Sequence, residues 1–326
     1  ARARASRAAG MAASAAGLLA FFLAYGVLQE RIMTRPYGPA EELFASAAFV
    51  VLCNRVVAVA GAAALLARAG RPLANAAPAW KSAGVGLSNT LATLCQWEAL
   101  RYVSFPAQTL GKCGKTIPVL LFGALLARKR YRAADYAVCL AISAGCALFL
   151  LTGEVGARAG GGGGEDTAFG LGLLGLYLAL DGFTSVFQEL LFKGYDMSAH
   201  NQMLHVNLAS GVVIFFVLLA KGELWASLDF SRRHPTFLVG SLGLSCAAML
   251  GQVMLYHSIK HYGALFFATV MTTRHIFSIT LSCMIYLHPM SWGQLFGAAV
   301  VFAALYYRAA ARTPPPPALG QKVLKV

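Results

Sequence analysis

Charged side chains are scarce in this chain of 326 residues. They make up 12% of it, whereas hydrophobic residues make up 58%. Soluble domains carry about 25% charged residues, because their surface has to face water. The composition therefore argues against a soluble fold, and most of the chain is expected to face lipid or other apolar helices.

Several sequence motifs that mark other protein classes are missing. The seven cysteines lie in apolar runs and form no CxxC pair, so neither a metal site nor a disulfide framework is predicted. The chain has no GxSxG, HExxH or Walker A motif, so it gives no indication of an enzyme or of ATP-driven transport. No cofactor is predicted.

The charges that are present are mostly positive, with 27 Lys and Arg against 13 Asp and Glu. In a soluble protein, a net charge of +14 would point to nucleic acid. Here most basic residues lie between apolar runs, where they set the orientation of membrane helices. No nucleic-acid partner is therefore predicted.

Ten apolar runs follow one another, each close to the 20 or so residues that cross a bilayer. They lie near residues 12–30, 42–67, 82–100, 104–127, 133–152, 168–192, 199–220, 236–259, 262–287 and 291–311. The sequence therefore predicts an all-α membrane protein with ten transmembrane helices. With the N-terminus on side one, sixteen Lys and Arg outside the membrane are counted on side one and seven on side two, so both termini are expected in the cytosol.

The chain divides at a run of five glycines, 160–164, which is typical of a flexible linker. The predicted segments are a cytosolic tail, a first five-helix repeat, the linker, a second five-helix repeat and a second cytosolic tail. In the same order, they cover residues 1–11, 12–152, 153–167, 168–311 and 312–326.

Polar residues recur in the two halves at a constant offset of 159 residues. The pairs are Gln29 with Gln188, Glu30 with Glu189, Arg101 with Lys260, and Lys115 with Arg274. Because each half has an odd number of spans, the halves are expected to lie in opposite orientations, as in transporters built from inverted repeats. The alternative is a chance match between similar helices.

Basic residues inside two runs are the main candidates for substrate binding. Lys112 and Lys115 are three residues apart in the fourth run and share one helix face. Arg274 lies in the ninth run between Thr273 and His275. Buried cations are costly unless they meet water, an anion or a carboxylate. Together, Lys115 and Arg274 predict a cationic site at the repeat interface that suits a phosphate-bearing solute.

Other interpretations of these polar residues stay open. The cations are alternatively snorkelling or held in a structural ion pair with Glu98 or Glu189. The candidates for gating or structural pairs are Gln29, Glu30, Glu98, Gln188 and Glu189, with Asp181 nearby and Lys193 as one possible partner. The same carboxylates are alternatively proton carriers. Gln96 and Tyr102 are candidates for contacts with a base.

Four segments resemble the UAA family of nucleotide-sugar transporters, within the drug/metabolite transporter superfamily. They are YGVLQERIM, CQWEALRYVSFPAQTLGKCGKTIPV, LDGFTSVFQELLFKGYDM and YGALFFATVMTTRHIFSITLSC. The nearest branch contains plant UDP-galactose/UDP-glucose transporters and animal Golgi transporters of 3′-phosphoadenosine 5′-phosphosulfate (PAPS). By motif, the resemblance implies that Lys112, Lys115 and Arg274 grip phosphates. Many members carry Lys or Gln after that arginine, whereas this chain has His275.

The resemblance implies ten helices, cytosolic termini and exchange across a Golgi or ER membrane. A nucleotide-linked donor would enter the lumen while a nucleoside monophosphate leaves. The C-terminal QKVLKV lacks the usual paired lysines of ER retrieval, which favours the Golgi. The sequence does not choose between a UDP-hexose and PAPS, and it leaves the oligomeric state open, a homodimer included. The alternative function is a proton-coupled exporter of small metabolites.

Overall fold

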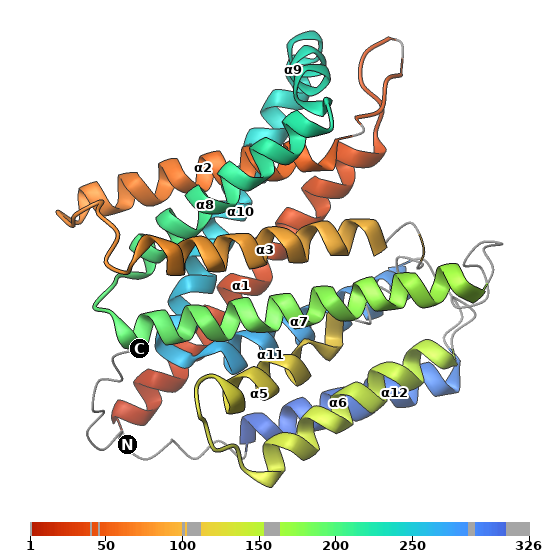
Figure 1. The fold of residues 1–326 in the computed structure, drawn as a ribbon. Helices are drawn as coiled ribbons and strands as arrows, with labels where there is room; N and C mark the ends of the chain where they lie inside the picture. The colour runs from red at the N-terminus through yellow and green to blue at the C-terminus, as the bar shows by residue number, and fades with distance from the viewer. Residues whose placement is uncertain are drawn as a thin grey trace. The chain divides into compact units, whose positions relative to one another are not determined.

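A computed structural model describes residues 2–39, 41–44, 46–99, 102, 112–152, 164–285 and 291–310 (Figure 1). In this part of the chain, the regular structure is helical, apart from one isolated bridge between Tyr37 and Glu42. The prediction of an all-α chain is therefore confirmed for the residues that the structure describes.

Every apolar run of the sequence contains helical structure. The helices are α1 (Arg2–Thr34), α2 (Ala47–Arg68), α3 (Ala79–Ala99), the 3-10 helix η1 (Lys112–Lys115), α5 (Thr116–Leu125), α6 (Ala133–Leu151), α7 (Gly164–Gly194), α8 (Ala199–Ala220), α9 (Glu223–Arg233), α10 (Pro235–Tyr262), α11 (Ala264–Ile285) and α12 (Trp292–Ala310). One continuous helix was predicted for the run at 104–127. The described part of this run is instead the 3-10 helix η1 followed by the α-helix α5. The helix α9, which is short and amphipathic, was also not predicted from the sequence.

Five helices are long and apolar enough to cross a membrane. Their apolar stretches are Ala9–Met33, Ala47–Arg68, Ala168–Gly194, Ala199–Ala220 and Pro235–Tyr262. Shorter apolar helices occur at Thr116–Leu125, Ala133–Gly145 and Trp292–Val301. The chain is therefore an integral membrane protein. Exposed tryptophans at or near helix ends, Trp80, Trp225 and Trp292, are of the kind that lies at membrane interfaces.

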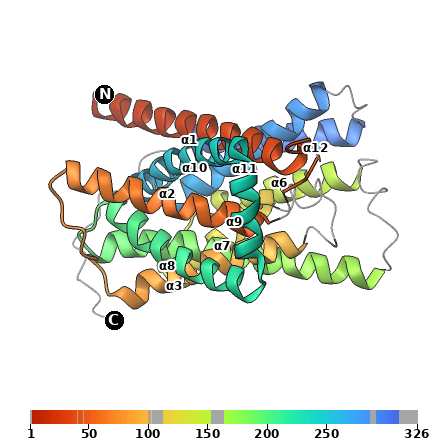
Figure 2. The ribbon, with the colours of Figure 1, turned by 90° about the horizontal axis from the view of Figure 1, so that it is seen from above.

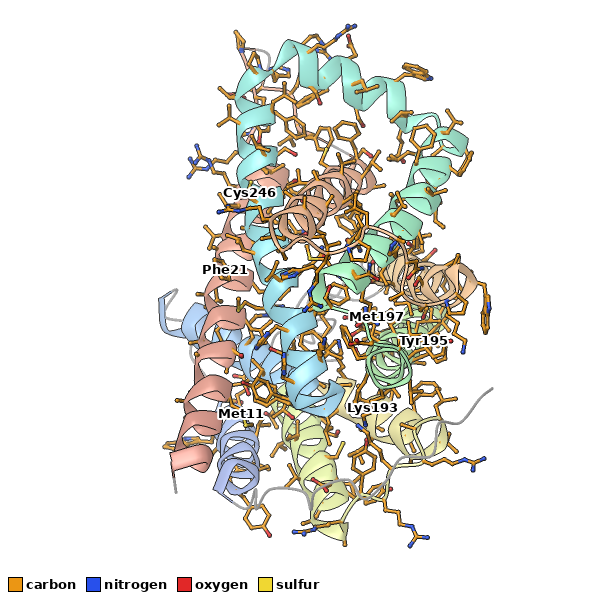
Figure 3. All side chains as sticks on the ribbon, turned by 90° about the vertical axis from the view of Figure 1, so that its left-hand side faces the viewer. Met11, Phe21, Lys193, Tyr195, Met197 and Cys246 are labelled. Atoms are coloured by element: carbon orange, nitrogen blue, oxygen red, sulfur yellow. The ribbon has the colours of Figure 1, made fainter. Side chains whose placement is uncertain are left out.

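The helices form two compact units that do not coincide with the two halves of the sequence. Unit 1 comprises Ala1–Thr90 and Tyr195–Tyr262, and unit 2 comprises Leu91–Gly194 and Gly263–Val326. In unit 1, α2 packs on α8, and α1 runs beside α10 (Figure 2). Figure 3 labels Met11 and Phe21 along α1. In unit 2, α6 packs on α12, and α5 contacts α7 and α11.

Small residues let helices approach closely within each unit. A Cβ at Gly86 of α3 would lie 2.7 Å from that of Ala209, and the Ser210 hydroxyl of α8 donates to the Gly86 carbonyl at 3.1 Å. In unit 2, a Cβ at Gly145 of α6 would lie 2.7 Å from the Gly297 carbonyl oxygen of α12. Such contacts hold membrane helices together where no hydrophobic effect acts between them.

One end of unit 1 has an aromatic cluster beneath α9. The Phe44 ring lies 4.3 Å from that of Phe237 and 5.1 Å from that of Phe230. Arg233 at the end of α9 donates to Glu42 at 2.6 Å. The loop before α2 and the helix α9 are therefore joined by both apolar packing and an ion pair.

Candidate functional site

A buried ion pair joins η1 to α7 in unit 2. Lys115 is only 8% exposed, and its Nζ lies 2.5 Å from Oδ2 of Asp181. The same Nζ lies 4.7 Å from the ring centroid of Phe267 on α11. A carboxylate and an aromatic face thus compensate the cost of placing this ammonium group inside a helical bundle. The ion-pair partners expected from the sequence were Glu98 or Glu189, whereas the structure shows Asp181.

The local sequence explains how Lys115 and Asp181 meet. Pro118 is the third residue of α5. The first N–H groups of an α-helix have no partner within the helix, so a proline at this position costs no helical hydrogen bond. Gly182, the neighbour of Asp181 on α7, lies against this proline: a Cβ there would be 2.8 Å from the Pro118 Cβ. Because glycine lets α5 and α7 approach, the lysine at the start of α5 reaches the carboxylate on α7.

Arg274 belongs to the same group of helices. It lies on α11, two helical turns beyond Phe267, and α11 packs on both η1 and α7. The Tyr177 hydroxyl, one turn before Asp181 on α7, is within electrostatic reach of both Asp181 and Arg274. Unit 2 therefore gathers the two predicted cations on neighbouring elements, with an acidic and a phenolic side chain of α7 near them. Tyr177 and Phe267 were not predicted from the sequence.

Threonine hydroxyls beside Arg274 are already used by the helix. Thr273 donates to the Thr269 carbonyl at 2.9 Å, and Thr272 donates to the Ala268 carbonyl at 3.0 Å. A phosphate oxygen needs a donated hydrogen, so Thr273 is a weaker candidate than Arg274. The side chain of His275 lies outside the described residues.

The remaining predicted substrate contacts are also in unit 2. Lys112 is partly buried in η1, and Gln96 is partly buried on α3. The Tyr102 ring packs edge-to-face on Phe169 of α7, with 5.1 Å between centroids. That contact engages the ring with α7.

Glu189 is the centre of a second ion-pair network in unit 2. Its carboxylate lies 2.5 Å from the Lys129 ammonium and 3.0 Å from that of Lys193, the partner considered from sequence. It also accepts the backbone N–H of Ala264 at 2.9 Å, in the first turn of α11. A negative charge is favourable at a helix N-terminus. Burial lowers the pKa of Lys129, and the Glu189 carboxylate opposes that shift.

The other candidates for gating or structural pairs are distributed over both units. Gln188 is buried on α7, and Glu98 is partly buried on α3, both in unit 2. Gln29 is partly buried on α1 in unit 1, and the side chain of Glu30 lies outside the described residues.

Arg55 in unit 1 was not singled out from the sequence. It lies inside the span Ala47–Arg68, and its Nη1 donates to Oδ1 of Asn207 on α8 at 3.0 Å. Basic residues inside apolar runs were the signal that identified Lys115 and Arg274. The same signal applies to Arg55, which is the one basic residue of the run at 42–67.

These features define the class: an integral membrane protein of packed helices that holds cations inside its helical bundles. The chain belongs to the UAA transporter family, whose model matches residues 11–312. The resemblance seen in the four sequence segments is thereby confirmed.

Named relatives are transporters. The chain is 45% identical to adenosine 3′-phospho 5′-phosphosulfate transporter 1 of Dictyostelium discoideum, over 91% of this chain and 82% of that one. It is 42% identical to UDP-galactose/UDP-glucose transporter 5 of Arabidopsis thaliana, over 89% and 84%. It is 40% identical to the human adenosine 3′-phospho 5′-phosphosulfate transporter 1, over 89% and 67%.

The fold is similar to that of a protein in a solved crystal structure. The match covers 93% of this chain and 97% of the chain in that structure. The TM-score is 0.67 and the sequence identity is 13%. At that identity the likeness shows the fold alone.

Proposed function

We propose that this protein is an antiporter that imports a nucleotide-linked donor into the Golgi lumen in exchange for a nucleoside monophosphate, with the ER as the alternative compartment. The observation that supports it best is Lys115, a lysine 8% exposed within unit 2, with Arg274 on a neighbouring helix. Two cations inside a membrane bundle match the charge of a nucleotide diphosphate or phosphosulfate group. The family membership and the names of the relatives support the same class of substrate.

The ion pair between Lys115 and Asp181 supplies a mechanism for binding. Asp181 lies against the lysine as its counter-charge inside the bundle. A phosphate group carries up to two negative charges and several acceptor oxygens, so it competes with the single carboxylate for the ammonium. Arg274 adds a planar fork that binds phosphate oxygens in pairs. Phosphate binding therefore exchanges one partner of Lys115 for another, without leaving the cation uncompensated.

The proposed architecture is ten transmembrane helices in two inverted repeats of five, with both termini in the cytosol. Two helix pairings support it. The second apolar run packs on the seventh, as α2 on α8, and the fifth packs on the tenth, as α6 on α12. Corresponding helices of the two halves are thus paired, as a two-fold relation between repeats requires. Alternating access would then move one bundle of helices against the other.

The proposed donor is PAPS or a UDP-hexose, because relatives of both names match at 45% and 42% identity. Both donors place two acidic groups side by side after the ribose, which suits Lys115 and Arg274 equally. The proposed counter-substrate is accordingly AMP, or another adenine nucleotide, or UMP.

Exchange in proteoliposomes tests this proposal. Purified protein is reconstituted, the vesicles are loaded with AMP or UMP, and uptake of labelled PAPS, UDP-galactose and UDP-glucose is measured separately. Uptake of at least one donor that depends on the internal nucleotide is expected. If correctly folded protein moves none of the three, the proposal is wrong.

Single substitutions test the two cations. Lys115→Ala and Arg274→Ala should each abolish exchange while the protein still inserts into the membrane. Arg68→Ala, at the exposed end of α2, is the matched control and should leave exchange unchanged. Normal exchange by both Lys115→Ala and Arg274→Ala would refute the assigned phosphate site.

The alternative is a proton-coupled exporter, in which a buried carboxylate carries the proton. Asp181 and Glu189 are both in ion pairs with lysines, which favours fixed charges over proton carriers. Uptake driven by a pH gradient without any internal nucleotide would favour the exporter.

A further inference from the structure

Basic side chains gather at one end of unit 1, where three of its apolar helices begin or end. They are Arg71 just after α2, His200 in the first turn of α8, and His257, Lys260 and His261 in the last two turns of α10, and we call these five residues the basic cluster. All three helices are long and apolar enough to cross a membrane. The cluster therefore lies where the chain leaves the membrane.

Hydrogen bonds hold these segments against one another. Asn201 of α8 donates to the Ala74 carbonyl, in the loop after α2, at 2.8 Å, and it accepts from the Ala76 N–H at 3.2 Å. Lys260 of α10 donates to the Met197 carbonyl, in the loop before α8, at 2.7 Å (Figure 3). The loop after α2, the start of α8 and the end of α10 therefore form one surface.

The members of the basic cluster are close enough to repel one another. His200 is within electrostatic reach of both Arg71 and Lys260. His257 is within electrostatic reach of His200 and Lys260, and its ring centroid lies 4.4 Å from that of His261. Bringing positive charges together costs free energy unless an anion lies among them.

The chain supplies little negative charge at this end of unit 1. In its described part, no carboxylate forms an ion pair with Arg71 or His200. Four Lys and Arg, four His and a single acidic residue occur in the three stretches that meet here, 68–81, 195–205 and 256–262. That acidic residue, Asp196, is exposed, and among the described residues it forms no ion pair. The positive charge is thus left for an anion from outside the chain.

We propose that the basic cluster binds the phosphate monoester of an anionic lipid headgroup, such as that of a phosphoinositide. Basic pockets between membrane helices bind such headgroups at the cytosolic side. Leu73 in the loop after α2 and Trp80 at the start of α3 are 51% and 68% exposed, and tryptophan is a residue of membrane interfaces. Apolar side chains beside the cations favour a lipid over a free phosphate ion.

The proposed topology puts this end of unit 1 in the cytosol. The helix α1 begins at the same end, because a Cβ at Gly10 would lie 2.7 Å from the Tyr262 hydroxyl at the end of α10. With the N-terminus in the cytosol, the cluster faces the leaflet that carries negative surface charge. This orientation rests on the proposed topology, whereas binding in detergent, where both ends of the protein are accessible, does not.

Lipid titration of the purified full chain in detergent, followed by native mass spectrometry, tests the proposal. The probes are phosphatidylinositol 4-phosphate and phosphatidylinositol, which differ by one phosphate monoester. The wild type should bind the first lipid about tenfold more tightly than the second. Arg71→Gln should weaken binding of phosphatidylinositol 4-phosphate about fivefold, the contribution of one basic residue near a membrane surface. The double variant Arg71→Gln with His200→Gln should bind the two lipids equally.

The variants are chosen so that the protein stays folded. Arg71 is exposed, and its backbone N–H donates to the Leu66 carbonyl at 3.0 Å, a bond that Arg71→Gln keeps. Arg71→Lys keeps the charge and should keep most of the preference for the phosphorylated lipid. Lys221→Gln is the matched control, because it removes an exposed charge at the opposite end of α8. It should bind both lipids as the wild type does.

Three results would overturn the proposal. The first is an equal dissociation constant for the two lipids in the wild type, or no change in both Arg71→Gln and the double variant. The second is an equal loss of binding in Lys221→Gln, which would indicate attraction by net charge alone. The third is binding of inorganic phosphate or of the soluble inositol bisphosphate headgroup as tight as that of the lipid, which would make a free anion the occupant. No nucleotide is present in this titration, so a failure of the proposed exchange would leave its result unaffected.

Discussion

The two units of this protein hold a buried cation in different ways. In unit 2, Lys115 lies 2.5 Å from the Asp181 carboxylate, so its charge is compensated within the chain. In unit 1, Arg55 donates to a neutral amide, Asn207, at 3.0 Å. Removing the buried cation should therefore affect stability in opposite directions in the two units. Removal of Lys115 in unit 2 leaves the Asp181 carboxylate without its counter-charge. Removal of Arg55 in unit 1 takes away a charge that no described carboxylate compensates.

The largest expected effect is that of Lys115→Ala. It removes a phosphate ligand, so exchange should fall by at least about 100-fold. It also leaves Asp181, whose side chain is 22% exposed, without its cation, which costs up to about 3 kcal/mol of stability. The double variant Lys115→Ala with Asp181→Ala should regain most of that stability but no exchange. Thermal unfolding in detergent and exchange in vesicles measure the two effects. Exchange recovered by the double variant would show that Lys115 is structural only.

Glu189→Gln should be next in size. It removes the carboxylate that pairs with Lys129 and Lys193, and it should destabilise the protein by about 2–3 kcal/mol. Lys129 should then lose its proton at a lower pH, because burial already lowers its pKa and the opposing carboxylate is gone. The matched control is Lys193→Gln: this lysine is 45% exposed, so its loss should cost no more than about 1 kcal/mol. Equal losses of stability in Glu189→Gln and Lys193→Gln would show that Glu189 is not the centre of this ion-pair network.

Arg55→Gln sharpens the comparison directly. Because no described carboxylate is left behind, the free energy of unfolding should change by less than about 1 kcal/mol, or the protein should become more stable. Thermal unfolding without ligand, beside Lys115→Ala, gives the measurement. A loss as large as that of Lys115→Ala would mean that Arg55 has an internal anionic partner, and the two units would then be alike.

The smallest effect is expected at the exposed end of unit 1. The hydrogen bond from Arg233 lowers the pKa of Glu42 below its ordinary value of 4.5. A carboxylate with a lowered pKa in the folded state contributes stability above pH 4.5, and that contribution is lost as the pH falls through the folded value. The protection of the α9 amides, taken relative to the intrinsic exchange rate at each pH, should therefore be unchanged between pH 7 and pH 5 and should fall below about pH 4. Glu42→Gln should abolish this loss of protection, and a variant that retained it would place the titrating group elsewhere.

Much of the helix pattern could be predicted from the sequence, because apolar length is a local property. The runs at 199–220 and 133–152 coincide almost residue for residue with α8 and α6. The amphipathic helix α9 could not be found in this way, since its sequence, ELWASLDFSRR, is neither long nor apolar. The division of the helices into units was equally out of reach, because it depends on packing between residues far apart in the chain.

The sequence was sufficient to predict the cations of the candidate site, but it was not sufficient to predict which side chains they pair with. Lys115 was found because a lysine within an apolar run is costly, whereas its partner Asp181 lies 66 residues away, near several other carboxylates that fitted as well. Arg55 carried the same signal as Arg274. Unlike the chosen cations, it has neither a polar counterpart at the 159-residue offset, where Ile214 lies, nor a second lysine three residues away, as Lys115 has in Lys112.

The central claim is tested most directly by the dependence of donor uptake on internal nucleotide, measured side by side for the wild type and the double variant Lys115→Ala with Asp181→Ala. The account predicts that internal AMP or UMP stimulates uptake of labelled PAPS or a UDP-hexose by the wild type, and that Lys115→Ala with Asp181→Ala is folded but shows no stimulation. Wild-type uptake of these donors that ignores the internal nucleotide, or stimulation that survives in the double variant, would contradict it.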